Sequence, residues 1–183
     1  VLASPRFLFR VEAPVAGTEA IAEVDEYSLA SRLSYFLWST MPDAELVRLA
    51  GKGELRRDLA GQVKRMLADP KAQALVKNFT GQWLQVRDVE SVPINARAVL
   101  GFNARPTRNG RVEFDSAMRR AMRSETEMCF DHVLKQDRSV LELVDSDYTF
   151  LNETLAKHYG LPDVSGEEMR LVKLPPDSPR GGV

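Results

Sequence analysis

The sequence predicts an all-α fold, an irregular bundle of about six to eight helices with one long loop. Apolar residues recur at helical spacing over most of the 183 positions. Aspartate and proline stand where helices would begin, and glycine stands where several would end. With 44% apolar residues the chain can bury a sizeable core. We therefore expect a single helical domain over 1–183, or alternatively two sub-lobes over 1–90 and 112–183.

The first half of the chain predicts a series of short helices. The segment "DEYSLASRLSYFLWS" carries an apolar stripe behind Asp25, a favoured N-cap residue, and would end before Pro42. "PDAELVRLAG" predicts a short helix with proline entry and glycine exit. "LRRDLAGQVKRMLAD" and "DPKAQALVKNFTGQWLQV" predict two helices that meet at Asp69 and Pro70 as an antiparallel hairpin, with Trp83 on the buried stripe.

The second half begins with a break in the helical pattern. Residues 88–113 lose the period and gather proline, asparagine and glycine, which predicts a long surface loop. "FDSAMRRAMRSETEMCFDHVLKQD" restores the period after Asp115 and predicts the longest helix. A final helix would run from about Phe150 to Tyr159, capped by Asp147 or Thr149. "MRLVKL" is a strand-like piece near the end.

Charge and cysteine content exclude several classes of function. The 25 basic and 26 acidic residues leave a net charge of -1, so no overall field attracts nucleic acid or an anionic membrane. No apolar run approaches the roughly 20 residues that cross a bilayer. The single cysteine, Cys129, forms no C-x-x-C-H signature, so we expect no haem and no other cofactor in this chain.

The stretch "SETEMCFDHVLK" places a carboxylate, a thiol and an imidazole on one arc of the longest predicted helix: Glu125, Cys129 and His132. A carboxylate on an inward face must find a cationic or hydrogen-bonding partner, or take up a proton. We favour a structural glutamate paired with an arginine, and Arg32 is the partner that we name first. Cys129 is better explained as a small buried hydrophobe than as a nucleophile.

A reactive site remains the alternative explanation of the same residues. His132 points the same way as Glu125, and His158 lies on the inward face of the final helix. If they converge, Glu125, His132 and His158 could act as acid-base groups, or bind a metal together with Asp145 or Asp147. The close Glu-x-x-His spacing of di-metal bundles is absent, so we favour ordinary core histidines. Capping of the final helix explains the acidic cluster better than calcium binding.

Several longer motifs together resemble a domain family of unknown function, the cytochrome-linked PSD group of planctomycete-type and myxobacterial proteins. They are "LASPRFLFRVE", "YSLASRLSYFLWSTMPDAEL", "VKRMLADPKAQALVKNFTGQWL", "AMRSETEMCFDHVL" and "DRSVLELVDSDYTFLNETLAKHYGL". The resemblance implies a fragment of a larger exported protein in the cell envelope or periplasm. It also implies a downstream domain of the same polypeptide as partner, a c-type cytochrome domain among the options, so that any haem would lie in that neighbour.

Two functional hypotheses follow. The first is a non-catalytic interaction or scaffold module, which predicts a paired interior and an exposed apolar patch beside the next domain. The second is the half-site of an oxidoreductase or hydrolase, which predicts an inward cavity with perturbed titratable groups. The sequence favours the first hypothesis because the usual enzyme motifs are missing.

Overall fold

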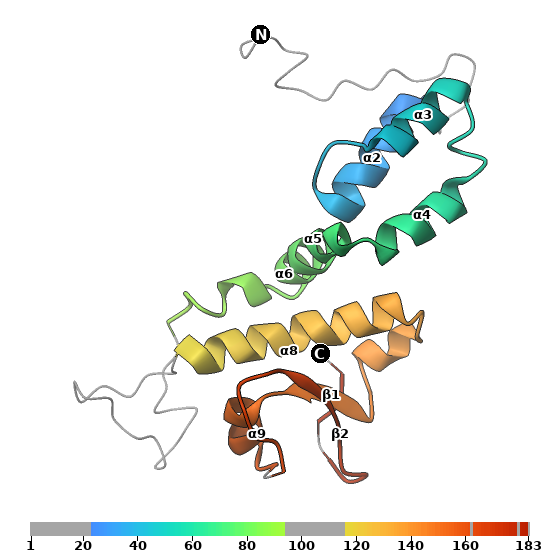
Figure 1. Cartoon of the computed structure of the whole chain (residues 1–183). Coiled ribbons are helices and arrows are strands. Elements are labelled where there is room, and N and C mark those ends of the chain that lie inside the picture. Colours follow the sequence, from blue (N-terminus) through green and yellow to red (C-terminus); the bar gives the residue numbers. More distant parts are fainter. Residues whose placement is uncertain (1–22, 94–115, 162, 179, 183) are drawn as a thin grey trace. The chain divides into compact units, whose positions relative to one another are not determined.

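The computed structural model describes residues 23–93, 116–161, 163–178 and 180–182. Helices dominate this part of the chain, which confirms the prediction of a mostly helical fold, and a small two-stranded hairpin accompanies them (Figure 1). The chain divides into two compact units, Val1–Leu75 and Val76–Val183, so the boundary falls inside the expected sub-lobe 1–90. Most of the expected loop 88–113, and Asp115 with it, lie outside the described residues.

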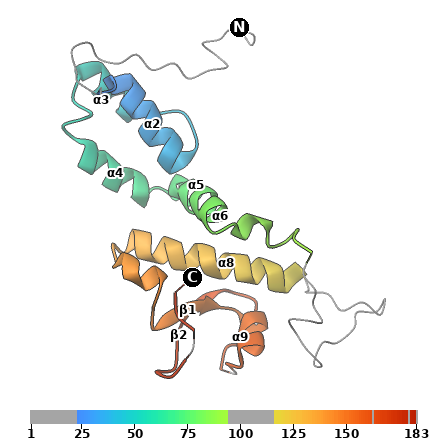
Figure 2. The same ribbon diagram turned by 180° about the vertical axis from the view of Figure 1, so that it is seen from behind.

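The first unit contains α2 (Glu26–Trp38), α3 (Ala44–Lys52), α4 (Leu59–Ala68), a 3₁₀ turn (Pro70–Ala72) and α5 (Gln73–Leu75). The Asp25 side chain accepts hydrogen bonds from two backbone N–H groups at the start of α2, as predicted. Figure 2 shows α2 and α3 side by side. The expected antiparallel hairpin at Asp69 is wrong, because α5 packs against α2 instead of folding back along α4.

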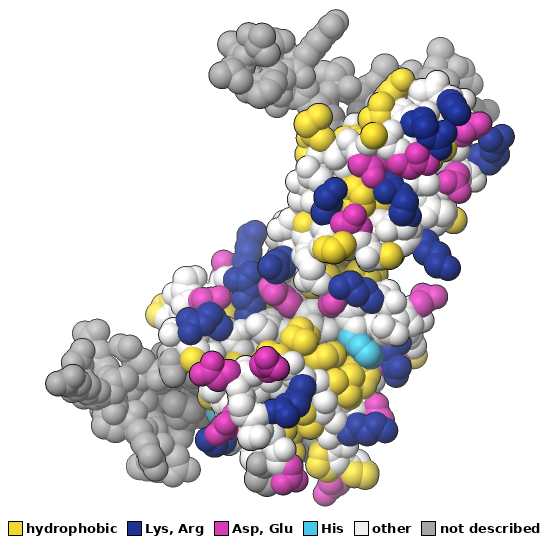
Figure 3. Space-filling model, viewed as in Figure 1, with side chains coloured by type: hydrophobic (Ala, Val, Ile, Leu, Met, Phe, Trp, Pro, Cys, Tyr) yellow, Lys and Arg dark blue, Asp and Glu magenta, His cyan; other side chains and the backbone are white. Residues whose placement is uncertain are grey.

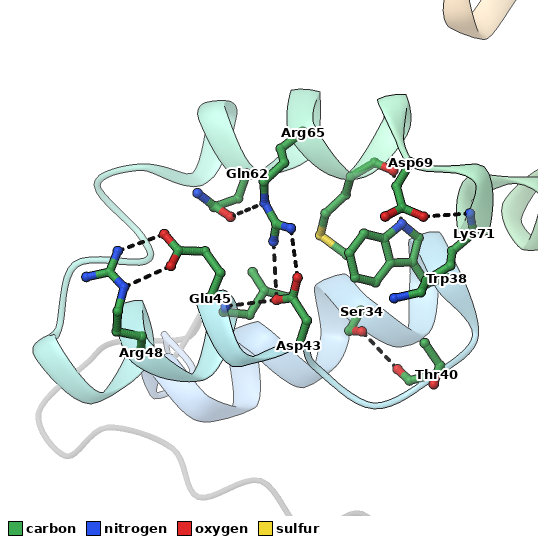
Figure 4. A network of polar contacts seen from close by, with 12 residues as sticks. Ser34, Trp38, Thr40, Asp43, Glu45, Arg48, Gln62, Arg65, Asp69 and Lys71 are labelled. Atoms are coloured by element: carbon green, nitrogen blue, oxygen red, sulfur yellow. Dashed lines mark hydrogen bonds and ion pairs between the residues drawn. The ribbon is translucent and has the colours of Figure 1, made fainter.

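One network of polar contacts holds the first unit together around a buried tryptophan (Figure 4). Trp38 is 3% exposed, and its indole Nε1 donates to the carbonyl of Met66 at 2.9 Å. Lys71 lies over the indole ring, 4.5 Å from its centroid. Arg65 contacts the same ring and binds the carboxylate of Asp43, the N-cap of α3, at 2.7 Å. The network therefore ties the end of α2 to α4 and to the start of α3.

The second unit is built on α8 (Ser116–Lys135), the longest helix described. A π-helical segment (Val76–Thr80), α6 (Gly81–Trp83) and a 3₁₀ turn (Val86–Asp88) precede it, and a 3₁₀ turn (Val140–Leu143) follows it. The strands β1 (Tyr148–Leu151) and β2 (Arg170–Lys173) then pair antiparallel, with Tyr148 opposite Lys173, and α9 (Glu153–Tyr159) lies between them in sequence. Helix α8 packs on both β1 and α9 (Figures 1 and 2).

Three local predictions, those of a strand, of the final helix and of a buried tryptophan, had different outcomes. The strand-like piece "MRLVKL" is confirmed as β2, but β1 occupies part of the segment that we assigned to the final helix. That helix starts at Glu153 and is capped by Asn152, whose side chain accepts from the Leu155 N–H. Trp83 is 53% exposed instead of buried, because the π segment before it adds residues to one turn and so turns its side chain off the predicted stripe.

The Asp43 carboxylate gives the first testable prediction. Burial alone would raise its pKa, but the Arg65 hydrogen bond, the Leu46 N–H and the nearby cationic charges outweigh burial, so the pKa lies below 3.8. Asp43→Ala removes both the helix cap and the Arg65 partner, and we expect a loss of about 1 to 2 kcal/mol in the free energy of unfolding at pH 7. Chemical denaturation measures this loss.

The direction of the Asp43 pKa shift predicts how the stability loss in Asp43→Ala depends on pH. A carboxyl with a lowered folded pKa stabilises the fold above its ordinary pKa of 3.8, and the contribution disappears as the pH falls through the folded value. The difference between wild type and Asp43→Ala should therefore shrink below about pH 4. Asp43→Asn, which keeps a capping oxygen, serves as the control and should lose less at pH 7. No loss in Asp43→Asn would contradict the role of the charge, and an equal loss in both variants would contradict the role of the cap.

Candidate functional site

Three elements of the second unit converge on the carboxylate of Glu125. The residue lies on α8 and faces the interior, as the helical spacing predicts. Its Oε1 accepts a hydrogen bond from the Thr149 hydroxyl on β1 at 2.6 Å, and its Oε2 accepts one from the Tyr159 hydroxyl at the end of α9 at 2.7 Å. Both distances lie in the usual range of O–H···O hydrogen bonds. Glu125 thus connects α8 to the strand and to the helix that follows it.

The partners of Glu125 are therefore hydroxyls within the second unit. Thr149 is 4% exposed, and Tyr159 and Glu125 are half-buried. Arg32 is an exposed residue of α2 in the first unit, and its pairing with Glu125 stays a prediction. Burial raises the pKa of the Tyr159 phenol, and the hydrogen bond to Glu125 and its negative charge raise it further. Tyr159 consequently keeps its proton and remains a donor.

A cavity of about 400 Å³ opens beside this carboxylate. Its lining comes from α8, β1, α9 and the C-terminal segment: Met122, Glu125, Thr126, Thr149, Tyr159, Arg180, Gly181 and Gly182. The guanidinium of Arg180 lies over the Tyr159 ring, 3.8 Å from its centroid. The sequence pattern gave no signal for Arg180, because it falls in a polar, proline-rich end without helical or strand periodicity.

Two glycines let the C-terminal segment approach the loop before β1. A Cβ on Gly181 would come within 2.8 Å of the backbone oxygen of Ser146. Gly182 has φ +76°, and its Cβ would come within 2.5 Å of the Val144 carbonyl. The Gly182 N–H donates to the Ser146 hydroxyl at 3.1 Å. Only glycine fits at these two positions, so the segment that carries Arg180 has a defined place at the cavity.

Cys129 lies one helical turn beyond Glu125 and is 4% exposed. Burial raises the pKa of its thiol to about 11, and the charge of Glu125 adds to this, although a hydrogen bond with Thr149 works in the opposite direction. Nucleophilic cysteines have a lowered pKa. The thiol of Cys129 is protonated at neutral pH, which agrees with its interpretation as a small buried hydrophobe.

The two histidines contact different aromatic residues. The His132 ring meets Tyr148 and Phe150 edge-on, with centroids 5.1 and 5.7 Å apart. His158 lies beside Tyr159, with ring centroids 5.6 Å apart. Seven residues separate Glu125 from His132, about 10 Å along a helix. The same helical face therefore does not bring the carboxylate and the imidazole into one ligand set.

The suggested metal site is not assembled in the described part of the chain. Within residues 23–93 and 116–182, apart from 162 and 179, no three His, Cys, Asp or Glu side chains lie together in a way that could hold a metal ion. Asp145 and Asp147 are exposed in the loop before β1, where the Asp147 carbonyl accepts from the Leu174 N–H. The set of Glu125, His132 and His158 with Asp145 or Asp147 thus lacks the convergence that a metal requires.

The surface of the second unit carries an apolar patch, which we call the Val140–Val144 patch. It consists of Val140, Leu141 and Val144, which are 72%, 71% and 78% exposed. Two of these residues belong to the 3₁₀ turn after α8, and the Val144 carbonyl lies against Gly182. On the molecular face shown in Figure 3, acidic and basic side chains are interspersed without a field of one sign, and hydrophobic side chains gather in places between them.

Comparison with known proteins finds one family. The family model described as "PSD4: Protein of unknown function (DUF1592)" matches residues 24–161, which include Glu125, Thr149 and Tyr159. The matched residues do not include Arg180 or the two glycines at the cavity. Searches of curated proteins and of solved structures returned no match. Among the described residues, no helix is both long and apolar enough to span a bilayer.

Removing the carboxylate of Glu125 tests its structural role. Glu125→Ala leaves the hydroxyls of Thr149 and Tyr159 without their acceptor, and we expect a loss of about 2 to 4 kcal/mol in the free energy of unfolding. Urea denaturation followed by circular dichroism measures it. Glu127→Ala is the matched control, since Glu127 lies on the same helix but is paired with Arg123, and it should cost less than about 1 kcal/mol. A loss below about 0.5 kcal/mol for Glu125→Ala would overturn the assignment.

The raised pKa values predict alkaline destabilisation. Burial, with the Glu142 hydrogen bond, raises the pKa of Tyr148 to about 12, and the folded pKa values of Cys129 and Tyr159 are raised as well. A group with a raised folded pKa stabilises the fold below its ordinary pKa, and this contribution disappears as the pH rises through the folded value. The free energy of unfolding should therefore fall as the pH rises from about 9 to 12.

A tyrosine variant tests which groups lower the free energy of unfolding at alkaline pH. Tyr159→Phe should make the decline with pH shallower, whereas Tyr27→Phe, at a 57% exposed position of the first unit, should leave the slope unchanged. Denaturation curves at a series of pH values give the slopes. A free energy of unfolding that stays constant from pH 9 to 11 would show that these groups ionise equally in the folded and unfolded chain.

Proposed function

We propose that this chain, which belongs to the PSD4 family of proteins of unknown function (DUF1592), is a non-catalytic helical interaction module of a larger exported bacterial protein. The observation that carries the proposal is the Val140–Val144 patch, in which three neighbouring aliphatic side chains are each more than 70% exposed. Burying one such side chain is worth about 1.5 to 3 kcal/mol. A partner that covers the patch would gain much of this free energy.

The turn that carries the patch is held in a fixed shape. Arg138 binds the Glu142 carboxylate at 2.6 Å, and the Tyr148 hydroxyl donates to the same carboxylate at 2.7 Å. The Arg138 guanidinium also lies over the Tyr148 ring, 5.4 Å from its centroid. These contacts bind the exposed turn to the buried strand β1. A surface that is already ordered loses little conformational entropy when it binds, which favours a specific partner.

The partner that we propose is the downstream domain of the same polypeptide. Gly182 lies against the Val144 carbonyl, so a polypeptide that continues past this residue emerges beside the patch. A partner tethered so close has a high effective concentration, and even a modest apolar contact then suffices. Following the family resemblance, we place the assembly in the cell envelope or periplasm and include a c-type cytochrome domain, with its haem, among the neighbours.

The alternative, a half-site of an oxidoreductase or hydrolase, has less support. Both oxygens of Glu125 accept hydrogen bonds from hydroxyls of the protein itself. The pKa values of Cys129 and Tyr159 are shifted upward, away from the neutral range in which a general acid or base works best. These contacts explain the inward polar residues as structural.

Hydrogen exchange tests the interaction module directly. The backbone amides of residues 140–146 should exchange at least about tenfold more slowly in the full-length polypeptide than in this 183-residue chain, because the downstream domain covers the patch. Leu141→Asp combined with Val144→Asp in the full-length polypeptide should restore fast exchange. The control, Val47→Asp, changes an exposed valine of the first unit and should have no effect on these amides. Equal exchange in the two polypeptides would contradict the proposal.

A further inference from the structure

The cavity beside Glu125 is bordered by two oppositely charged side chains, Glu125 and Arg180, that form no ion pair with each other. Glu125 and Arg180 both border it, yet in the part of the chain that the structure describes no ion pair joins them. The Arg180 side chain stacks on Tyr159 and makes no hydrogen bond or ion pair with any described residue. A carboxylate and a guanidinium that border one cavity without pairing with each other are complementary to a ligand that carries both charges.

The Glu125 carboxylate keeps acceptor capacity toward such a ligand. Two carboxylate oxygens offer about four lone-pair directions, and the hydroxyls of Thr149 and Tyr159 use one on each oxygen. These hydroxyls also fix the orientation of the carboxylate, so it needs no rearrangement to bind. A primary ammonium group, with three N–H donors and a compact positive charge, is suited to the remaining acceptor positions.

Arg180 presents the complementary half of the site. Its guanidinium carbon lies 3.8 Å from the centroid of the Tyr159 ring, and its N–H groups make no hydrogen bond with a described residue, so they can donate to a ligand. The fork of an arginine matches the two oxygens of a carboxylate. Gly181 and Gly182 hold the backbone next to Arg180 against the loop at residues 144–146, so the position of the arginine relative to the cavity is defined.

The remaining walls and the size limit the ligand to a small molecule. The volume of about 400 Å³ lies in the range of small-molecule sites. Met122 supplies an apolar surface for an aliphatic group, and Thr126 supplies a hydroxyl. An anion without a positive group would be repelled by Glu125, and a cation without a negative group would be repelled by Arg180. Both arguments favour a molecule with an ammonium and a carboxylate close together.

We propose that this cavity binds a free amino acid, with its ammonium group on Glu125 and its carboxylate on Arg180. This site is separate from the Val140–Val144 patch, so the proposal goes beyond the interaction module and does not depend on it. It gives the Glu125 cluster a second role, because the carboxylate that ties α8 to β1 and α9 also recognises the ligand. Arg180 would be a binding residue contributed by the C-terminal segment.

Calorimetric titration of the whole chain with each of the twenty common L-amino acids at pH 7 tests the proposal. We expect at least one to bind with a Kd below about 1 mM. The N-acetyl derivative of that amino acid, which lacks the ammonium charge, should bind at least about tenfold more weakly, and so should its methyl ester, which lacks the carboxylate. The two derivatives separate recognition of a zwitterion from recognition of either charge alone.

Arginine variants connect the binding to this cavity. Arg180 is exposed, so Arg180→Ala should leave the fold intact and weaken binding at least about tenfold. Arg138→Ala is the matched control, because Arg138 also stacks on a tyrosine but is paired with Glu142 and does not line the cavity. Glu125→Gln should weaken binding as well, provided that its circular dichroism spectrum is that of the wild type.

Several results would overturn the proposal. They are the absence of binding by all twenty amino acids, a methyl ester or N-acetyl derivative that binds as tightly as the parent, and unchanged affinity in Arg180→Ala. Equal exchange at residues 140–146 in the full-length polypeptide and in this chain would count against the interaction module alone, so the two proposals fail independently.

Discussion

The architecture of the second unit depends on how one half-buried carboxylate is satisfied. Taking Glu125 away from water is unfavourable unless its oxygens gain hydrogen bonds in exchange. The hydroxyls of Thr149 and Tyr159 supply them, and these residues come from a strand and from the end of a helix. The requirement therefore fixes the positions of β1 and α9 on α8. The apolar contacts among Ala121, Leu151 and Leu155 follow from the same arrangement.

The C-terminal segment adds a second charged residue, Arg180, to the cavity beside Glu125. Its glycines allow a close approach to the loop before β1, and that approach places Arg180 on Tyr159, the same residue that donates to Glu125. The carboxylate, the phenol and the guanidinium thus form one connected group at a cavity. The exposed Val140–Val144 patch lies next to the same segment, so occupancy of the cavity and coverage of the patch would act on neighbouring parts of the chain.

The sequence predicted those features that depend on local periodicity and capping. The long helix through Glu125, the cap at Asp25 and the strand-like character of "MRLVKL" all follow from residues close together in the chain. The sequence pattern did not predict β1, because all four residues of "YTFL" are buried and so show no alternation of polar and apolar residues. A fully buried strand of this kind resembles the start of a helix.

The hydrogen-bond donors to Glu125 were not predicted either, but for a different physical reason. Thr149 and Tyr159 are 24 and 34 residues from Glu125 in the sequence, and only the packing of β1 and α9 on α8 brings them together. Periodicity identifies which face of a helix is inward but does not say what meets it. We therefore named a cation, Arg32, whose pairing with Glu125 stays a prediction, and we did not name the two hydroxyls of the second unit. Arg180 was missed because its place depends on glycine contacts, which have no periodic pattern.

A double-mutant cycle between Glu125→Ala and Tyr159→Phe tests most directly whether the carboxylate organises the second unit. If the Tyr159 hydroxyl donates to Glu125 as described, the two substitutions remove the same interaction, and the cycle should give a coupling energy of about 1 to 3 kcal/mol in the free energy of unfolding. A coupling energy below about 0.3 kcal/mol would show that the two side chains act independently, and would contradict this account of the fold and of the site built on it.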